Sequence, residues 1–303
     1  MSLWSSVLYR EEEPNLRIFV SPFNNPFLNL ALEDHFLRGG ADLPILFLYV
    51  NRPCVVLGRF QNPWIECHLP YLVKNDIWLV RRQSGGGCVF HDEGNLNFSF
   101  ITSDPMIDRR KHAELLVSAF KKADISLEIS PRNDLWLNTR KISGSAYKQT
   151  KFGSFHHGTF LVNSDLEKLE ESLKHTLVAT ATKSIASVRS KVITLSEVFP
   201  HVEVDDVIEI IAHGLGSRTE TFDATLLSET QIQESFKNLR SWEWLWGETP
   251  EFELGDLVIK KGILKDSGKR FDLQEMKGKL SAEDLEKFFP DFSEQHRSSN
   301  LIL

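Results

Sequence analysis

Residues 81–87, Arg-Arg-Gln-Ser-Gly-Gly-Gly, form the segment best suited to bind an anionic ligand. Three successive glycines leave backbone amides without side-chain bulk, so a ligand can approach the main chain closely. The two arginines before them supply cationic donors. The segment is not a Walker A loop, because no Gly-Lys-Ser/Thr follows, and it is not GxGxxG. The alternative interpretation is a flexible turn with solvated arginines.

Two downstream segments carry complementary groups. Lys141 enters a predicted strand, and the small residues Ser143 and Gly144 leave its ammonium room to reach a ligand. Asn133 and Asp134 lie between two predicted strands, where such a pair is most often a simple turn. In the functional interpretation, Asp134 helps to hold a metal or an amine near a phosphate.

Paired histidines and three cysteines need separate consideration. His156 and His157 are adjacent, so in a strand they point to opposite faces and cannot bind one ion from the same side. With no third spaced ligand, we do not expect a zinc site. Cys54, Cys67 and Cys88 have no CxxC spacing, which argues against a disulfide framework and favours a reducing compartment.

The charge pattern concentrates positive charge in two stretches. The formal net charge is −7, which argues against a general nucleic-acid binder, so any anion site must be local. Residues 140–164 and 176–191 together hold seven Lys or Arg and no Asp or Glu. If they meet in space, they form a phosphate-sized positive site. The second stretch includes residues 183–191, KSIASVRSK, which we interpret as a surface loop.

The length of 303 residues fits one large domain plus something small. The longest apolar candidate, residues 45–50, is strand-sized, so no membrane span is expected. The first 14 residues lack the apolar core of a signal peptide, and three successive glutamates do not suit a mitochondrial presequence. We therefore expect a location in the cytoplasm or the mitochondrial matrix.

Hydrophobic periodicity predicts the elements that position these residues. A helix should begin at Asn25-Pro26 and stop at the glycines 39–40, and a hairpin should pair residues 89–91 with 96–101. Ser164 should cap a helix, and Ser228 with Gln231 should form a capping box. Further helices are predicted at 111–124, 164–175, 205–213 and 228–239, and strands at 45–50, 54–57, 77–80, 127–129, 135–137, 142–147 and around 160–162. The mixed order favours an α+β fold with a largely antiparallel sheet.

Five ordered motifs give the chain a family resemblance. RRQSGGGCVFHDEGN, PRNDL, RKISGSAYK, FHHGT and SVRSKV, in this order and spacing, resemble lipoate–protein ligase A and its relatives. VVLGRFQNPWIEC upstream and SWEWLWGETPEF downstream match the same family, so the resemblance covers residues 16–252. It implies a biotin/lipoyl protein ligase-like catalytic domain over residues 1–247, with a mixed sheet flanked by helices. Residues 248–303 would then form a reduced, small α/β accessory segment.

The resemblance implies an ATP-dependent enzyme that uses Mg²⁺. Such enzymes join lipoate or octanoate to AMP, release pyrophosphate, and transfer the acyl group from lipoyl-AMP to a lysine of an acceptor. The acceptors are the lipoyl domains of 2-oxoacid dehydrogenase E2 subunits and the H protein of glycine cleavage. Neither nucleic acid nor membrane is an expected partner.

Family matching also assigns roles to residues. Lys141 matches the catalytic lysine, which would lie between a carboxylate and a phosphate, and Asp134 would hold the metal. The residues matched to the lipoyl site are Arg82, Ser84, Gly85, Gly86, Gly87, His91 and His157. The residues matched to the nucleotide site are Asn133, Asp134, Lys141, Ser143, Gly144 and Lys183, with residues 183–191 as a loop that closes over the adenylate.

Other readings remain open at this point. The chain could be a lipoyl- or octanoyltransferase that uses preformed lipoyl-AMP or another acyl donor, because mammalian relatives act in that way and residues 248–303 are short for a bacterial accessory domain. A thioester route would use Cys88, although a small core residue is the simpler role for it. An inactive carrier of lipoyl-AMP and a biotin ligase are the remaining alternatives.

Overall fold

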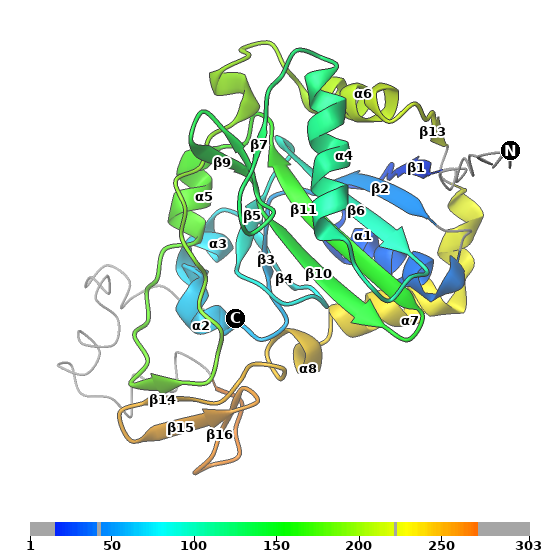
Figure 1. Ribbon diagram of the computed structural model, residues 1–303. Helices are drawn as coiled ribbons and strands as arrows, with labels where there is room; N and C mark the ends of the chain where they lie inside the picture. Colours follow the sequence, from blue (N-terminus) through cyan, green and yellow to red (C-terminus); the bar gives the residue numbers. More distant parts are fainter. Residues whose placement is uncertain (1–15, 41–43, 221–222, 272–303) are drawn as a thin grey trace, which may run out of the picture.

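The centre of the molecule is a six-stranded mixed sheet (Figure 1). The computed structural model describes residues 16–40, 44–220 and 223–271. The strands in spatial order are β10 (Ser145–Thr150), β11 (Gly153–Leu161), β6 (Asn95–Thr102), β2 (Ile45–Val50), β1 (Arg17–Val20) and β13 (Thr219–Glu220). The first four strands pair antiparallel, and β1 and β13 add in parallel beyond β2. The expected α+β class with a mixed, largely antiparallel sheet is confirmed.

Helices cover both faces of this sheet. Helices α4 (Arg109–Lys121) and α6 (Val204–Gly214) cover one face, and α4 crosses the front of the sheet in Figure 1. Helices α1 (Pro26–His35) and α7 (Thr230–Leu239) cover the other. The side chains of β2 divide accordingly: Leu46 and Leu48 pack in the α4 core, whereas Phe47 and Tyr49 pack in the α1 core. This is the period-2 alternation of a strand buried on both faces.

Helix α1 begins as the sequence predicts. The Asn25 side chain accepts hydrogen bonds from the backbone N–H groups of Phe27 and Leu28, and Pro26 occupies the first turn. A short π-helix, η1 (Phe36–Gly40), follows directly. Gly39 then adopts a φ of 98°, which ends the helical path where the glycine pair was expected to end it.

Two predicted helix caps are wrong. Helix α5 (Leu166–Ser172) is capped by Asp165, whose carboxylate accepts from the Lys168 N–H, and not by Ser164. Helix α7 starts after Glu229, without a capping box. Ser228 instead ends the 3₁₀-helix η3 (Ala224–Ser228), where its hydroxyl donates to the Thr225 carbonyl. At α5 the neighbouring carboxylate of Asp165 took the cap position, whereas the Ser228 hydroxyl bonds back to a carbonyl of its own 3₁₀ turn.

The predicted hairpin between residues 89–91 and 96–101 is also wrong. Strand β5 (Val89–His91) pairs antiparallel with β3 (Cys54–Leu57), which pairs in parallel with β4 (Trp78–Arg81) in a separate sheet. Strand β6 lies instead between β2 and β11. The connection is held elsewhere, because the Gly94 carbonyl accepts from Val162 and Asn163 and the Asp92 carboxylate accepts from the Asp165 N–H. These long-range bonds turn the chain from one sheet into the other.

The expected strand at 142–147 is two strands that separate at Gly144. Strand β9 (Arg140–Ser143) belongs to a three-stranded sheet with β8 (Leu135–Leu137) and β7 (Glu128–Ile129), whereas β10 is the edge of the large sheet. The chain therefore passes between two sheets immediately after Lys141, so this residue lies at a junction of the fold.

The segment after Gly247 packs against helix α2 (Pro63–Glu66). Strands β14 (Phe252–Leu254), β15 (Leu257–Lys260) and β16 (Ile263–Leu264) form a sheet with β12 (Ala181–Thr182). The rings of Phe252 and Phe271 lie 5.6 and 5.0 Å from Trp64, which belongs to helix α2. The division at 247/248 stays a prediction, and the helix expected beyond these strands lies outside the described residues.

The remaining short helices are α3 (Leu69–Lys74), η2 (Leu195–Glu197) and α8 (Trp242–Leu245). Across the described ranges, no helix combines the length and apolar character needed to span a bilayer.

Candidate active site

Two adjoining cavities meet at Lys141. The first cavity, of about 550 Å³, lies between the large sheet, the glycine run and residues 185–188. The second, of about 610 Å³, lies between β9, α5 and residues 187–192. The residues that line both are Cys88, Val89, Lys141, Gly144, Thr159, Ser187 and Val188. A ligand larger than either cavity can therefore extend through this junction.

Lys141 and Asp134 form an ion pair at the junction, with 3.0 Å between Nζ and Oδ2. Strands β8 and β9 are joined by Asn138 and Thr139, whose φ values of 48° and 66° are those of a two-residue hairpin turn. Asp134 precedes β8, and Lys141 pairs with Trp136 across the hairpin. The turn therefore brings together two side chains that are seven positions apart in the sequence.

The segment around Asn133 is both a turn and a cavity wall. The Ser130 hydroxyl accepts from the backbone N–H groups of Arg132 and Asp134. Asn133 adopts a φ of 63°, which asparagine tolerates better than most residues. Asn133 and Asp134 both line the first cavity.

The two arginines before the glycines differ in position. Arg81 is fully buried and donates to the carbonyls of Gly58, Arg59, Gln61 and Leu245, away from both cavities. The expectation that both arginines supply donors to a ligand is therefore not met by Arg81.

Arg82 lines the first cavity and holds the glycine run in place, because its Nη2 donates to the carbonyls of Gly85 and Gly87 at 2.7 Å each. Burial lowers the pKa of Arg82 to about 10, so it remains charged at neutral pH.

A buried chain of hydrogen bonds fixes Arg82. The Arg82 Nε donates to the Ser84 hydroxyl, which lies 2.7 Å from His157 Nε2, and His157 Nδ1 lies 2.9 Å from Glu33 Oε1. Because a carboxylate only accepts, His157 Nδ1 carries a hydrogen and donates it to Glu33. Ser84 and His157 thus act through Arg82 on the shape of the glycine run. Helix α1 supplies Glu33, which the sequence analysis did not identify, although a carboxylate directly after Leu30-Ala31-Leu32 was a visible signal.

A second buried chain orients His91. Asn29 Nδ2 donates to Asn51 Oδ1, so the Asn51 amide nitrogen donates to His91 Nδ1 at 3.0 Å. Burial and the nearby Arg82 lower the pKa of His91 to about 3, so the ring is neutral with its hydrogen on Nε2. Nε2 has no hydrogen-bond partner among the described residues. His91 therefore lines the first cavity as a neutral side chain rather than as an acid at neutral pH.

The three glycines have different surroundings. Gly86 adopts a φ of 91°, and a Cβ there would lie 2.9 Å from Arg82 Nη2. A Cβ on Gly87 would lie 3.2 Å from the Ser187 hydroxyl, whereas a Cβ on Gly85 would meet no atom within 4 Å. Gly86 and Gly87 line the first cavity. The sequence did not reveal Gly58, where a Cβ would collide with the Gly86 carbonyl at 2.1 Å.

Of the remaining residues predicted to bind the nucleotide, Ser143 and Gly144 line a cavity and Lys183 does not. Gly144 lies at the junction, where a Cβ would approach Lys141 Nζ at 3.3 Å, and Ser143 lines the second cavity. Lys183 is not in the lining of either cavity: its Nζ lies 2.6 Å from Glu251 and its side chain is 73% exposed. The structure therefore does not place Lys183 with the other predicted residues.

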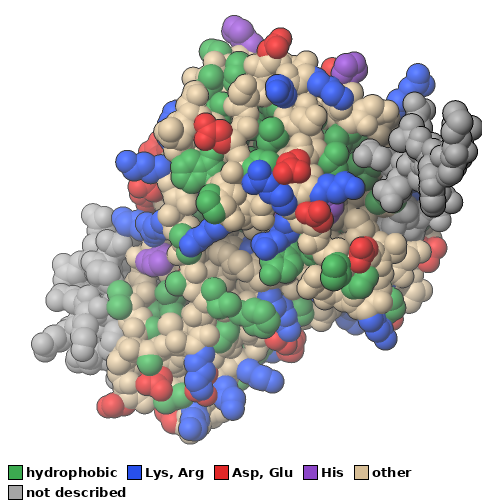
Figure 2. Space-filling view, in the orientation of Figure 1, with side chains coloured by type: hydrophobic (Ala, Val, Ile, Leu, Met, Phe, Trp, Pro, Cys, Tyr) green, Lys and Arg blue, Asp and Glu red, His purple; other side chains and the backbone are tan. Residues whose placement is uncertain are grey.

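The two basic stretches do meet, because the backbone of Lys141 bonds with those of Lys191 and Ile193. Their charges are dispersed, however, since Arg140 pairs with Glu197 and Lys183 pairs with Glu251. Figure 2 accordingly shows basic and acidic side chains interspersed on the described part of this face. Among the described residues, Lys141 is the basic side chain that lines both cavities.

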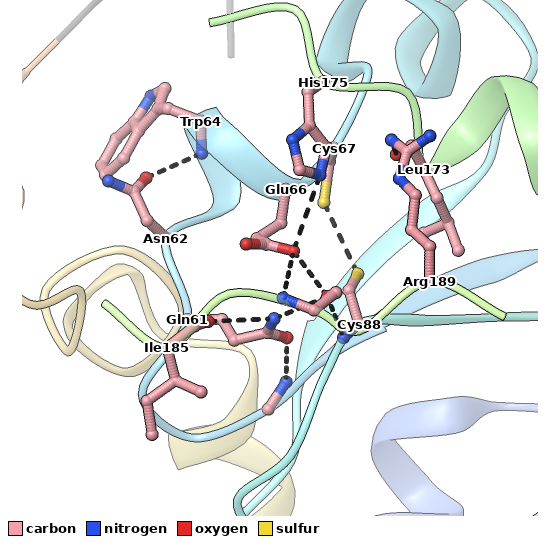
Figure 3. A network of polar contacts seen from close by, with 12 residues as sticks. Gln61, Asn62, Trp64, Glu66, Cys67, Cys88, Leu173, His175, Ile185 and Arg189 are labelled. Carbon is pink, nitrogen blue, oxygen red and sulfur yellow. Dashed lines mark hydrogen bonds and ion pairs between the residues drawn. The ribbon is translucent and has the colours of Figure 1, made fainter. Parts of the chain in front are cut away.

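Residues 183–191 are held by polar side chains of residues 61–66, and Figure 3 shows Gln61 reaching toward Ile185 of this segment. Ser187 Oγ donates to Glu66 Oε2 at 2.5 Å and accepts from Gln61 Nε2 and the Cys88 N–H, each at 2.9 Å. Gln61 also donates to the Ile185 carbonyl. Sequence reasoning missed Gln61, Glu66 and Ser187, because their connection spans more than 120 residues.

Cys88 and His156 have structural surroundings. Cys88 Sγ lies 3.9 Å from Cys67 Sγ in an apolar cluster, which favours its role as a core residue. His156 points away from His157, as expected for neighbours in a strand, and stacks on His112 of α4 with ring centroids 5.5 Å apart. Within the described ranges, no three His, Cys, Asp or Glu side chains are grouped to bind a metal. Mg²⁺ commonly binds one or two carboxylates plus substrate phosphates, and Asp134 at the junction fits such a site.

Both the fold and the sequence motifs match proteins of one family. The model of the lipoyl protein ligase A/B catalytic domain matches residues 25–216. A lipoate-protein ligase A of Psychrobacter cryohalolentis is 39% identical over 250 residues, which cover 78% of this chain and 74% of the relative.

Solved structures agree. A lipoate-protein ligase A bound with ATP is 29% identical, with a TM-score of 0.63 over 77% of this chain and 98% of the other. A bi-partite lipoate protein ligase from Thermoplasma acidophilum, described with its E2 lipoyl domain, is 27% identical, with a TM-score of 0.63 over 77% of this chain and 96% of the other.

Proposed function

The chain belongs to the lipoyl protein ligase A/B family, and on that premise we propose that it is a lipoate–protein ligase. It activates lipoate with ATP to lipoyl-AMP and transfers the lipoyl group to a lysine of an acceptor protein. The observation that carries the proposal is the Lys141–Asp134 pair at the junction of two cavities, since this reaction must bring a carboxylate against a phosphate.

The acyl chain occupies the first cavity. Its buried part is lined by Leu30, Tyr49 and Val56, which suit an alkyl chain, and by the bare backbone of Gly86 and Gly87. Arg82, Ser84, Gly85 and His157 shape this cavity through the hydrogen bonds described above, and His91 contributes a neutral wall.

The nucleotide lies across the junction, with its phosphates at Lys141 and Asp134 and its base in the second cavity. Asn133, Ser143 and Gly144 line the path between the two. Asp134 would hold Mg²⁺ together with phosphate oxygens, and the ion would add positive charge where the phosphates repel the carboxylate.

Lys141 lowers the barrier of the first half-reaction. Two anions approach each other, and a preorganised ammonium between them stabilises the charge of the transition state. The same ammonium then stabilises the carbonyl oxygen when the acceptor lysine attacks and AMP leaves. Residues 185–188 shield the anhydride from water meanwhile.

The acceptors follow from the same proposal. We propose the lipoyl domains of 2-oxoacid dehydrogenase E2 subunits and the H protein of glycine cleavage, because these display the lysine that carries lipoate. The T. acidophilum relative described with its E2 lipoyl domain supports the first of these.

One experiment tests the function. Purified protein is mixed with ATP, Mg²⁺, lipoate and an apo lipoyl domain, and the mass of the acceptor is followed. Acceptor modification that depends on ATP supports a ligase. Modification only with synthetic lipoyl-AMP would identify a lipoyltransferase, and octanoate in place of lipoate measures the chain preference.

A further inference from the structure

The Ser187 hydroxyl has its full set of hydrogen bonds. A hydroxyl can donate once and accept twice, and this one donates to Glu66 and accepts from Gln61 and from the Cys88 backbone. The Ser187 N–H lies 3.3 Å from the same Glu66 oxygen. Four hydrogen bonds therefore join one residue of the 183–191 loop to the platform beneath it.

Gln61 and Glu66, which form the platform under the loop, are buried and hydrogen-bonded. Gln61 and Glu66 are 0% and 1% exposed, and Gln61 Oε1 accepts from the Gly58 N–H. The Gln61 carbonyl is in turn held by Arg81. The function of the buried Arg81 is thus to fix the segment on which the loop rests.

The loop has little apolar contact to hold it. Ile185 and Val188 are 50% and 68% exposed, and Lys183 and Arg189 are exposed as well. Its attachment therefore depends on polar bonds, which exchange for bonds to water when the loop lifts. A contact of this kind opens more easily than an apolar one, and segments with few apolar contacts are those that open locally.

Ser187 lies where opening matters most. Ser187 and Val188 line both cavities together with Lys141, and the absence of a side chain on Gly87 lets Ser187 approach it closely. We propose that Ser187 pins the 183–191 loop over the cavity junction, where the loop keeps lipoyl-AMP from water. Gln61 and Glu66 are the positioning residues that hold Ser187 in place. This inference rests on the proposed function, which places the mixed anhydride at that junction.

The test compares Ser187→Ala with Ser184→Ala. Both changes remove a hydroxyl from the same segment, but the Ser184 hydroxyl bonds to the Thr182 hydroxyl and, in the described part of the chain, lines neither cavity. Trypsin cleaves after Lys183, Arg189 and Lys191, so cleavage of the ligand-free protein reports how often the loop is open. We expect Ser187→Ala to be cleaved about tenfold faster than the wild type and Ser184→Ala to be unchanged.

The second measurement supplies synthetic lipoyl-AMP without an acceptor and follows AMP release. Ser187→Ala should hydrolyse it about tenfold faster than the wild type. Glu66→Gln should give a smaller increase, and adding it to Ser187→Ala should have less than its full separate effect, since the stronger of the two bonds to Glu66 runs through the Ser187 hydroxyl.

The outcomes separate the two proposals. Equal AMP release from the wild type and Ser187→Ala, equal cleavage by trypsin, or additive effects of Glu66→Gln and Ser187→Ala would each overturn the pin. A wild-type protein that retains no lipoyl-AMP would overturn the proposed function and the pin's role in retention with it. Trypsin cleavage in that case still reports whether Ser187 holds the loop.

Discussion

Replacing Lys141 by alanine tests the proposed chemistry most directly. The change removes an ammonium that lies 3.0 Å from Asp134 at the junction of the cavities. Loss of one preorganised donor to a developing charge typically lowers a rate about 10²–10³-fold, or about 2.7–4 kcal/mol. We therefore expect pyrophosphate release to fall by at least about 10²-fold.

The geometry suggests the upper end of that range. Lys141→Ala leaves the Asp134 carboxylate without its cation, beside the site proposed for the phosphates. Two like charges about 4 Å apart repel each other by about 4 kcal/mol at an effective dielectric constant near 20. Without Mg²⁺, which Asp134 is proposed to hold, Lys141→Ala/Asp134→Asn should therefore bind ATP better than Lys141→Ala alone. With Mg²⁺ the double variant should not recover the rate.

The assay follows pyrophosphate release with lipoate and ATP, alongside a thermal melt and a titration with lipoate. The matched control is Lys151→Ala, which removes an exposed lysine beside Phe152 at the turn of the β10–β11 hairpin, outside both cavities. Folding should change little in either variant, and lipoate affinity should change little in Lys151→Ala. Normal pyrophosphate release by a folded Lys141→Ala protein would refute the assignment of this lysine.

Three further outcomes are expected. Gly86→Ala should cost about 1–2 kcal/mol of stability and weaken lipoate binding more than ATP binding, because φ is 91° and the new Cβ meets Arg82. Gly85→Ala, where a Cβ meets open space, should leave stability and lipoate binding unchanged. Thermal melts and separate titrations with lipoate and ATP measure these effects. Thr139→Gly should raise the unfolding free energy by about 1 kcal/mol, since a β-branched residue at a φ of 66° is strained, and an unchanged melting temperature would contradict this. Burial lowers the pKa of His156 to about 3. Below pH 6.5 the unfolded chain therefore binds a proton at His156 that the folded protein does not bind. The contribution of His156 to the unfolding free energy should fall by about 1.4 kcal/mol per pH unit from pH 6.5 toward 3. His156→Phe should flatten urea-unfolding stability against pH by that amount, and the exposed His201→Gln should not.

The sequence predicted features that depend on neighbouring residues. The start of α1 at Asn25-Pro26 and its end at the glycine pair are set by local hydrogen bonds and backbone preferences, and both are confirmed. The opposite orientation of His156 and His157 follows from the strand period alone. The family was also recognisable, because its motifs are short local segments whose order the chain preserves.

Tertiary structure decided which segments meet. The pattern of residues 89–91 and 95–102 fits a hairpin. Hydrogen bonds that Gly94 and Asp92 accept from residues 162–165 instead direct these two strands into different sheets. Two helix caps differ for local reasons. Asp165 took the cap position predicted for Ser164, and the Ser228 hydroxyl bonds instead to the Thr225 carbonyl.

The site shows the same division. Lys141, Asp134 and the glycine run were visible in the sequence as residue types suited to anions, and a seven-residue hairpin is enough to bring the first two together. Whether a charged side chain faces a cavity depends on partners far along the chain. The sequence therefore could not distinguish Arg81 from Arg82, because Arg81 is held away from the cavities by the carbonyls of Leu245 and of residues 58–61. Glu33, Gln61 and Ser187 became functional candidates only when folding placed them within hydrogen-bond distance of residues more than 90 positions away, which no local pattern encodes.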